Sequence, residues 1–246
     1  MSMERKPSVT IVVPVYNEAQ ELAERIETLV SFLDRELTGY AWEVVIADNA
    51  STDETLPLAY RLSHRLTHVR VLHLDKKGRG LAVKTAWMRS SKDYLAYMDV
   101  DLSTDVKHLL PLLSALQRGY DIAVGTRNAW GSRVYGRSLL RTITSKGYIL
   151  LVKLLFWVKF TDAQCGFKAV RRSVAHAILP RIKDNGWFFD SELLIIAEKL
   201  GLRIYEEPVR WIDNPGSTVR VMRTAQGDVE GLLRLLWTKP WKTHHP

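Results

Sequence analysis

The sequence has little of what marks a secreted or membrane-spanning protein. Cys165 is the only cysteine, so no intrachain disulfide can form and a reducing compartment is expected. No stretch approaches the roughly 20 apolar residues that a membrane-spanning helix needs. Residues 1–8 are polar and lack the apolar segment of a secretory signal, so we expect a cytoplasmic protein.

Acidic residues are missing from one long segment. Residues 127–159 contain seven basic residues and no acidic one, in a chain of 246 residues with net charge +8. This excess favours an anionic partner such as phosphate, an acidic lipid surface or nucleic acid. Nucleic acid is the least favoured, because no recognition motif is present and the aromatic residues lie mostly in apolar runs. Repeats, low-complexity segments and linkers are absent too, so we expect residues 1–246 to form one domain.

The first hundred residues alternate between apolar runs and segments of helical periodicity. The runs predict strands over residues 9–13, 43–47, 69–74 and 94–98. The periodic segments predict helices over residues 22–33, 54–66 and 81–89. Pro14 is expected to end the first strand and Asn17 to cap the first helix. This order predicts an α/β fold with a mostly parallel sheet and helices on both of its faces.

The basic segment is predicted to be an unusual helix. Arg133, Arg137, Arg141 and Ser145 recur every four residues, which would place them on one helical face. Residues 148–158 are apolar apart from one lysine, which suits an element at a membrane surface. We therefore expect residues 133–159 to form a basic and apolar membrane-facing helix. The alternative is a buried helix with a solvated basic face.

The remaining residues predict shorter elements. Strands are expected over residues 121–125 and 203–208, and a helix over residues 193–200. A turn is expected at residues 214–217, followed by a helical tail over about 221–246.

Asp99 and Asp101 follow the apolar run at residues 94–98, with one residue between them. Ligands of open α/β sheets sit outside the carboxyl ends of strands. Two carboxylates there can hold Mg²⁺ or Mn²⁺ and leave positions free for phosphate oxygens. The alternative is that both are turn and helix-cap residues. Other polar residues also follow predicted strands and should lie near this pair: Tyr16, Asn17, Glu18, Asp48 and Gly80.

Six segments in order carry a family resemblance: residues 9–18, 47–53, 99–101, 125–127, 162–168 and 189–192. Over residues 8–220 the chain resembles inverting glycosyltransferases of family 2, which have the GT-A fold. Within that family it is most similar to the polyprenyl-phosphate sugar transferases, specifically the dolichyl-phosphate glucosyltransferase and mannosyltransferase group. The form of residues 162–168, Asp-Ala-Gln-Cys-Gly-Phe-Lys, is closer to the glucosyl branch.

The resemblance implies a nucleotide-sugar site. Pro14, Tyr16 and Glu18 would line the nucleoside pocket, and Asp48 would hydrogen-bond the base or ribose. The resemblance also places Lys77, Gly80 and Arg220 near the donor, Arg220 in a loop that closes over it. Asp99 and Asp101 would hold Mg²⁺ or Mn²⁺ on the diphosphate. Ser103 stands where some relatives supply a third ligand, which leaves that position to water.

The resemblance further implies a polyprenyl-phosphate acceptor and a membrane surface as partners. Its phosphate would meet Arg127, Arg137, Arg141 and Ser145, while Gln164 and Asp190 would shape the sugar and acceptor pocket. The phosphate would attack the anomeric carbon, with inversion of configuration. A phosphomonoester with a second pKa of about 6 is already largely dianionic at neutral pH. Asp162, which stands at the family's base position, is therefore expected to orient groups rather than to take a proton.

Three alternatives stay open at this point. The first is transfer of mannose from GDP-mannose, and the second is a family 2 transferase with a non-lipid acceptor. The third is a nucleotidyltransferase, which is less favoured because residues 14–18 are neither cationic nor glycine-rich.

Overall fold

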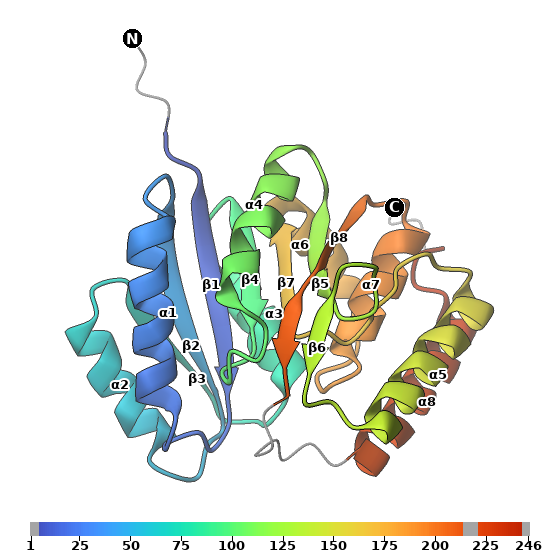
Figure 1. Ribbon diagram of the computed structural model, residues 1–246, viewed down its shortest axis with the longest axis horizontal. Coiled ribbons are helices and arrows are strands. Elements are labelled where there is room, and N and C mark those ends of the chain that lie inside the picture. The colour runs from blue at the N-terminus through green and yellow to red at the C-terminus, as the bar shows by residue number, and fades with distance from the viewer. Residues whose placement is uncertain (1–4, 214–220, 243–246) are drawn as a thin grey trace.

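The chain folds as a twisted sheet that is covered by helices on both faces (Figure 1). The computed structural model describes residues 5–213 and 221–242. The strands are β1 (Ser8–Val15), β2 (Ala41–Asn49), β3 (Val69–Leu74), β4 (Tyr94–Met98), β5 (Ile122–Thr126), β6 (Arg133–Tyr135), β7 (Phe167–Arg171), β8 (Ile204–Pro208) and β9 (Arg210–Ile212). The helices are α1 (Leu22–Glu36), α2 (Thr55–Arg65), α3 (Arg79–Arg89), α4 (Leu109–Gln117), α5 (Leu139–Phe156), α6 (Arg172–Ile178), α7 (Phe189–Lys199) and α8 (Val221–Thr238), with short 3₁₀ turns at Val106–His108 and Leu179–Arg181.

Within the described residues the main sheet has seven strands in the order β3-β2-β1-β4-β7-β5-β8. Strands β1 to β4 pair in parallel, as predicted, and β5 pairs in parallel with β8. Strand β7 runs antiparallel between β4 and β5. The predicted mostly parallel α/β fold is confirmed, and its helices follow from the alternating sequence.

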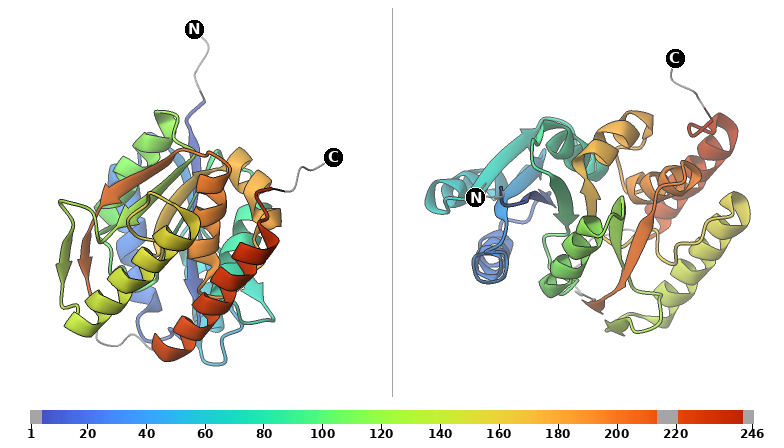
Figure 2. Two further views of the ribbon diagram at one scale, coloured as in Figure 1. Left: turned by 90° about the vertical axis from the view of Figure 1, so that its right-hand side faces the viewer. Right: turned by 90° about the horizontal axis from the view of Figure 1, so that it is seen from above.

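The sheet separates two apolar cores. In β1, Val9, Ile11 and Val13 face one core with α1, α2 and α4, while Val12 faces the other with α3. Helices α5, α6, α7 and α8 join the second core, and Figure 2 shows this layered arrangement. A strand that buries both of its faces has no polar alternation, which explains why β1 and β4 read as continuous apolar runs.

Three local predictions in the first half are wrong. Helix α1 begins at Leu22, and Asn17 adopts φ 55° outside it. The Asn17 carboxamide oxygen instead accepts a hydrogen bond from the Thr52 backbone N–H (2.8 Å). Pro14 lies inside β1 rather than after it, and the pairing of β1 with β4 stops at Val12. Helix α3 begins at Arg79 rather than at residue 81, so Gly80 belongs to its first turn.

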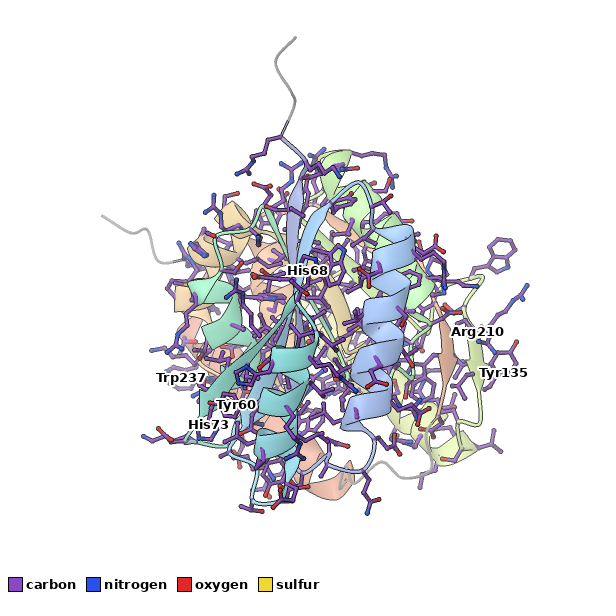
Figure 3. All side chains as sticks on the ribbon, turned by 90° about the vertical axis from the view of Figure 1, so that its left-hand side faces the viewer. Tyr60, His68, His73, Tyr135, Arg210 and Trp237 are labelled. Carbon is purple, nitrogen blue, oxygen red and sulfur yellow. The ribbon has the colours of Figure 1, made fainter. Side chains whose placement is uncertain are left out.

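The prediction of one helix over residues 133–159 is wrong. Residues 133–135 form β6, which pairs with the distant strand β9, and Figure 3 shows Tyr135 and Arg210 close together there. Helix α5 begins only at Leu139, where the Ser138 hydroxyl accepts a hydrogen bond from the Arg141 N–H (3.2 Å). Arg133 and Arg137 therefore do not share a helical face with Arg141. The cause is a long-range strand pairing that a four-residue spacing cannot reveal.

The later elements lie close to their predicted bounds. The predicted strands over 121–125 and 203–208 are β5 and β8, and the helix expected at 193 begins earlier, at Phe189. The tail helix α8 ends at Thr238 and lies beside α5 (Figures 1 and 2).

Candidate active site

Polar side chains gather at the carboxyl ends of β1, β2 and β4. Tyr16 follows β1, Asp48 is the second-to-last residue of β2, and Asp99 follows β4. Burial raises the pKa of the Glu18 carboxyl, and the nearby acids Glu21 and Asp101 raise it further. The structure thus brings together the residues that were predicted to share one edge of the sheet.

Asp99 is placed by the chain segment that precedes β7. Its backbone N–H donates to the carbonyl oxygen of Gly166 (3.1 Å), and its carboxylate lies directly against Gly166. A Cβ at residue 166 would come within 1.8 Å of Asp99 Oδ2, so only glycine fits there. Asp101 accepts hydrogen bonds from the Ser103 N–H (2.9 Å) and hydroxyl (2.6 Å). Both carboxylates line a small pocket that also contains Trp211.

These residues offer part of a divalent-metal site. Two carboxylates are hard oxygen ligands of the kind that Mg²⁺ and Mn²⁺ prefer, whereas the Ser103 hydroxyl is bound to Asp101. Among the residues that the structure describes, no group of three His, Cys, Asp or Glu side chains could hold a metal. The donor set fits an ion that is shared between the protein and ligand oxygens, as expected from Ser103 standing at the third position. The alternative prediction, that these are turn residues, is also correct for Asp101, because its carboxylate accepts hydrogen bonds from Ser103 within the same turn.

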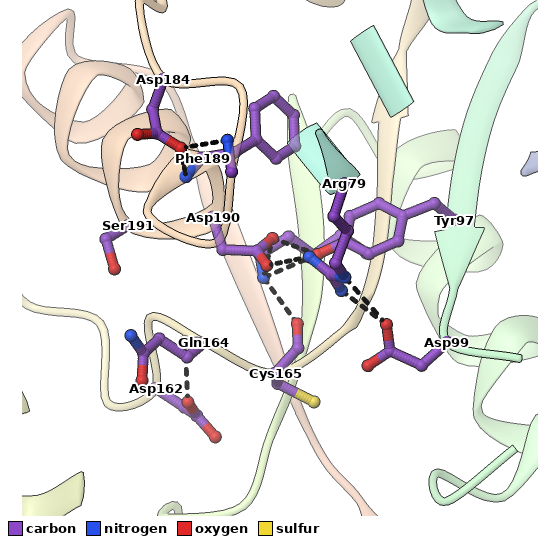
Figure 4. A network of polar contacts seen from close by, with 12 residues as sticks. Arg79, Tyr97, Asp99, Asp162, Gln164, Cys165, Asp184, Phe189, Asp190 and Ser191 are labelled. Atoms are coloured by element: carbon purple, nitrogen blue, oxygen red, sulfur yellow. Dashed lines mark hydrogen bonds and ion pairs between the residues drawn. The ribbon is translucent and has the colours of Figure 1, made fainter. Parts of the chain in front are cut away.

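Arg79 is the central residue that sequence reasoning missed. Its side chain is 8% exposed and connects two carboxylates (Figure 4). Nη2 lies 2.6 Å from Asp99 Oδ1, and Nη1 lies 2.7 Å from Asp190 Oδ2. The signal was present in the sequence, since Arg79 stands between Gly78 and Gly80. A Cβ at residue 80 would come within 2.5 Å of Phe189 Cβ, so these glycines bring α3 against α7.

Asp190 is enclosed by three donors. Besides Arg79, it contacts Lys168 Nζ (2.8 Å) and the Tyr97 hydroxyl. Burial alone would raise the pKa of the Asp190 carboxyl, but Lys168 and Arg79 outweigh it and lower this pKa. Asp190 was predicted to shape the sugar and acceptor pocket, and that role stays a prediction. In the structure its carboxylate holds the Arg79 guanidinium beside Asp99.

Arg127 and Asp162 form a second buried ion pair. Arg127 Nε lies 2.7 Å from Asp162 Oδ2, Nη2 lies 2.9 Å from Oδ1, and the Arg127 N–H also donates to Oδ2. Burial opposes ionisation of Asp162, yet Arg127 and these hydrogen bonds lower its pKa to about 2. A carboxylate with that pKa is a poor general base. The geometry therefore agrees with the expected orienting role.

Two more arginines, Arg137 and Arg141, lie near this pair. Burial and the nearby Arg127 and Arg141 lower the pKa of Arg137. Arg141 Nη1 lies 2.6 Å from Asp213, whereas no carboxylate pairs with Arg137 in residues 5–213 and 221–242. Ser145 lies one turn after Arg141 on α5. Although the predicted helical face is absent, Arg137 still lies near Arg127 and Arg141.

The other end of the site has a different character. Asp48 is fully buried, and its Oδ2 lies 2.7 Å from Nδ1 of His73 on the edge strand β3 (Figure 3). Its Oδ1 is buried and has no hydrogen-bond partner. Lys77 Nζ lies 3.3 Å from the centre of the Tyr16 ring, which keeps both residues beside the end of β1. This end therefore offers an aromatic ring, a cation and a free carboxylate oxygen.

A further polar cluster lies between α5, α7 and α8. Of its residues, only Gln164 was predicted to be a site residue. Gln164 Nε2 donates to Asp228 Oδ2 on α8 (2.8 Å), and the Tyr148 hydroxyl donates to Ser191 Oγ (2.7 Å). Asp228 carried no signal in the sequence, because a single acid in an amphipathic helix is usually solvated. Arg220 and Ser217, which were predicted to lie near the donor, fall outside the described residues.

The chain was compared with protein families, curated proteins and solved structures. The family model for glycosyl transferase family 2 matches residues 10–179. Glycosyltransferase AglD of Haloferax volcanii is 36% identical over 93% of this chain, which spans 37% of that protein. Dolichyl-phosphate β-glucosyltransferase of Drosophila melanogaster is 33% identical over 88% of this chain and 71% of its own length. The human enzyme of that name is 31% identical over 85% of this chain and 68% of its length.

Among solved structures, the chain is similar to glucosyl-3-phosphoglycerate synthase from Mycobacterium tuberculosis in complex with Mn²⁺, UDP-glucose and phosphoglyceric acid. The TM-score is 0.67 at 16% identity, over 94% of this chain and 80% of that one. This likeness shows a shared GT-A fold. With the family model matching most of the sequence and relatives above 30% identity, the chain belongs to glycosyltransferase family 2.

Proposed function

We propose that this protein transfers glucose, with inversion, from UDP-glucose to a polyprenyl or dolichyl phosphate. The observation that carries the proposal is the order of groups along one edge of the sheet. Asp48 lies at β2, Asp99 and Asp101 follow β4, and Arg127 follows β5. This order suits a nucleoside, a metal-bound diphosphate and an acceptor phosphate in succession. The relatives named dolichyl-phosphate β-glucosyltransferase support the glucose and lipid assignments.

The reaction needs little proton transfer from the protein. The acceptor phosphate is an anionic nucleophile, so it has to be positioned and desolvated rather than deprotonated. Arg137 has no carboxylate partner within the described residues, which leaves its donors available to that phosphate. Asp162 holds the nearby Arg127 in a fixed orientation.

The leaving diphosphate requires charge compensation. Mg²⁺ or Mn²⁺ held by Asp99 and Asp101 would neutralise the charge that develops on it. The similar M. tuberculosis synthase was crystallised with Mn²⁺ and UDP-glucose, which supports this choice. Arg79 fixes the orientation of Asp99, so that carboxylate is already directed toward the pocket before a ligand binds.

The acceptor tail needs a membrane, and two neighbouring helices offer an apolar surface. In α5 and just after it, Leu139, Ile143, Leu154 and Trp157 are between 67% and 86% exposed. Trp237 on the adjacent α8 is 92% exposed. Among the described residues, no helix is long and apolar enough to cross a bilayer. We therefore place this surface against the cytoplasmic face of a membrane as a peripheral contact.

Two alternatives follow from specific observations. The free oxygen of Asp48 could accept an N–H from either uracil or guanine, so GDP-mannose is a second candidate donor. A non-lipid acceptor carrying a phosphate would also suit the arginines, as the phosphoglycerate-bound synthase illustrates.

The test is transfer of label from UDP-glucose, and in parallel from GDP-mannose, to a short polyprenyl phosphate. Assays contain Mg²⁺, Mn²⁺ or EDTA. We expect metal-dependent label in the lipid phase from UDP-glucose alone. Label from GDP-mannose instead would reassign the sugar. Metal-dependent hydrolysis of the donor without lipid labelling would keep the site and contradict the acceptor.

A further inference from the structure

Two carboxylate oxygens beside the candidate active site are buried without a hydrogen-bond partner. They are Oδ1 of Asp48 and Oδ1 of Asp228. The only other such side-chain atom in the described residues is Nε2 of His176, on α6, which follows the opposite end of β7. Most buried polar atoms in native proteins are paired, so an unpaired acceptor needs an explanation. The unpaired oxygen of Asp48 is explained by the nucleoside proposed to bind there, whereas no ligand has been proposed for that of Asp228.

The order of the strands indicates which part of the donor can reach Asp228. Asp48 at β2 and Asp99 at β4 are separated by β1, and β7 lies on the far side of β4. A donor with its base at Asp48 and its diphosphate at Asp99 would direct its sugar toward the chain that enters β7. Gln164 belongs to that chain, and its amide holds Asp228 at 2.8 Å.

Helix α8 is fixed firmly enough to contribute a site residue. A Cβ at Gly231 would come within 2.3 Å of the Phe188 ring, so the helix packs closely on the segment that begins α7. Arg234 Nη2 lies 2.9 Å from Glu192 Oε2 on α7. Leu232 and Leu235 are buried beneath the same helix. Asp228 therefore stands on a docked helix rather than on a loose tail.

The negative charge around Asp228 indicates which part of the substrates its carboxylate can bind. Its carboxylate contacts Gln164, and burial, helped by the negative charges of Asp184 and Asp190, raises its pKa to about 6. A carboxylate repels phosphate, which excludes both the diphosphate and the acceptor phosphate as its ligand. A sugar hydroxyl is neutral and donates readily to a carboxylate oxygen.

We infer that Oδ1 of Asp228 accepts a hydrogen bond from one hydroxyl of the transferred hexose. Helix α8 thereby supplies a specificity-determining residue of the sugar pocket. Gln164 orients Asp228, and the Tyr148–Ser191 pair borders the same cluster. This inference rests on the proposed function only in taking a nucleotide-hexose as the donor.

The experiment measures binding rather than transfer. Titration calorimetry in Mn²⁺ compares UDP-glucose with UDP for the wild type and for Asp228→Asn. We expect the affinity for UDP-glucose to fall about 10- to 100-fold, while the affinity for UDP is unchanged. The Gln164 amide would hold the Asn oxygen, so an N–H would replace the charged acceptor that faces the hydroxyl. Glu230→Gln is the matched control, since it removes an exposed acid from the same helix. It should leave both affinities as in the wild type.

A second arm identifies the hydroxyl. The 2-, 3-, 4- and 6-deoxy analogues of UDP-glucose are titrated into both proteins. One analogue should bind the wild type weakly and lose nothing further in Asp228→Asn, while the other three lose as much as UDP-glucose. Asp228→Ser is a second variant with the same expected pattern. Unchanged binding of UDP shows that each variant is folded.

Three results would overturn the inference. They are equal losses for UDP and UDP-glucose, no loss for either, or the same loss for all four analogues. If only GDP-mannose binds the wild type, the comparison is made between GDP-mannose and GDP. If neither donor binds the wild type, the proposed function fails and this inference fails with it. Donor binding without transfer to polyprenyl phosphate would contradict the acceptor alone and leave the result for Asp228 valid.

Discussion

The carboxylates at the nucleoside end of the site differ from those at the acceptor end in the partners that they contact. At the nucleoside end, Asp48 keeps one oxygen without a partner, although the residue is fully buried. Near the acceptor end, Asp162 and Asp190 are equally buried, but each is tied to cations. The first half therefore offers acceptors to a ligand. In the second half the acids hold arginines, and those arginines are what a ligand would meet.

This difference corresponds to the chemistry of the proposed substrates. A base and a metal-bound diphosphate need acceptors and hard oxygen ligands, whereas an attacking phosphate needs cations. Arg79 joins the two halves, because it contacts Asp99 on one side and Asp190 on the other. Asp228 is the exception, since it is an acid in the second half with a free oxygen. The predictions below test this division.

Removing the residue that joins the halves should have the largest effect. Arg79→Met removes one of the two cations that contact the buried Asp190. It also removes the ion pair that holds Asp99. We expect the free energy of unfolding to fall by about 3 to 5 kcal/mol, as for breaking a buried ion pair from one side. The measurement is urea unfolding.

Arg70→Gln is the control for this loss. The Arg70 side chain is 76% exposed in its pair with Glu43. Its removal should cost less than about 1 kcal/mol. Similar losses in both variants would contradict a central structural role for Arg79.

Removing one carboxylate from each half should separate their roles in catalysis. Asp99→Asn removes a proposed metal ligand and should lower kcat by about 10²- to 10³-fold, in line with loss of transition-state charge stabilisation. Asp162→Asn keeps a group that can orient Arg127 and should cost only about 10-fold. The measurement is kcat for both variants at saturating Mn²⁺. Losses of kcat of the same size would mean that Asp162 takes a direct part in catalysis. They would contradict the view that Asp99 binds a ligand while Asp162 only positions Arg127.

The cations of the second half should act on the acceptor alone. Arg137→Gln should raise KM for the polyprenyl phosphate by about 10-fold, because a charge-assisted contact to phosphate is lost. KM for UDP-glucose should not change. Arg133→Gln on β6 removes an exposed arginine close by and serves as the control. A matching rise in KM for the donor would place Arg137 on the diphosphate instead.

The same contrast explains what could be predicted from the sequence. Strands β1 to β4 and their helices follow from local apolar periodicity, and the carboxyl ends of parallel strands necessarily share one edge. Asp48, Asp99 and Asp101 could therefore be placed without a structure. Pattern alone did not select the metal reading for Asp99 and Asp101, and the family resemblance added that choice.

The second half depends on contacts between distant residues. The spacing of Arg133, Arg137 and Arg141 suggested a helix, but β6 pairs with β9 some distance along the chain. Arg79 stands between two glycines, yet its two carboxylate partners lie 20 and 111 residues away. Asp228 becomes notable only once burial is known. Local propensity cannot report any of these, because the first depends on a long-range strand pairing and the other two on how α3, α7 and α8 dock.

The smallest predicted effect concerns two acids that Gln164 connects. The Asp162 carboxylate accepts the Gln164 N–H (3.0 Å), and Asp228 accepts its side-chain amide. Their pKa values are shifted in opposite directions, to about 2 and about 6. For Asp162 the lowered pKa stabilises the fold above the unfolded pKa, and this stability is lost as pH falls through about 2. For Asp228 the raised pKa favours the protonated form, so stability falls as pH rises from its unfolded value toward 6.

Urea unfolding of wild type and Asp228→Asn at about pH 5 and pH 6 tests that sign. The wild type should lose about 1 kcal/mol relative to the variant over this interval, since one pKa unit corresponds to about 1.4 kcal/mol. Asp162 stays ionised in the folded protein throughout, so it adds no slope there. A difference that does not change with pH would mean that Asp228 ionises normally in the folded protein. A free carboxylate oxygen at that position would then carry no cost in stability, and the contrast between the two acids would rest on geometry alone.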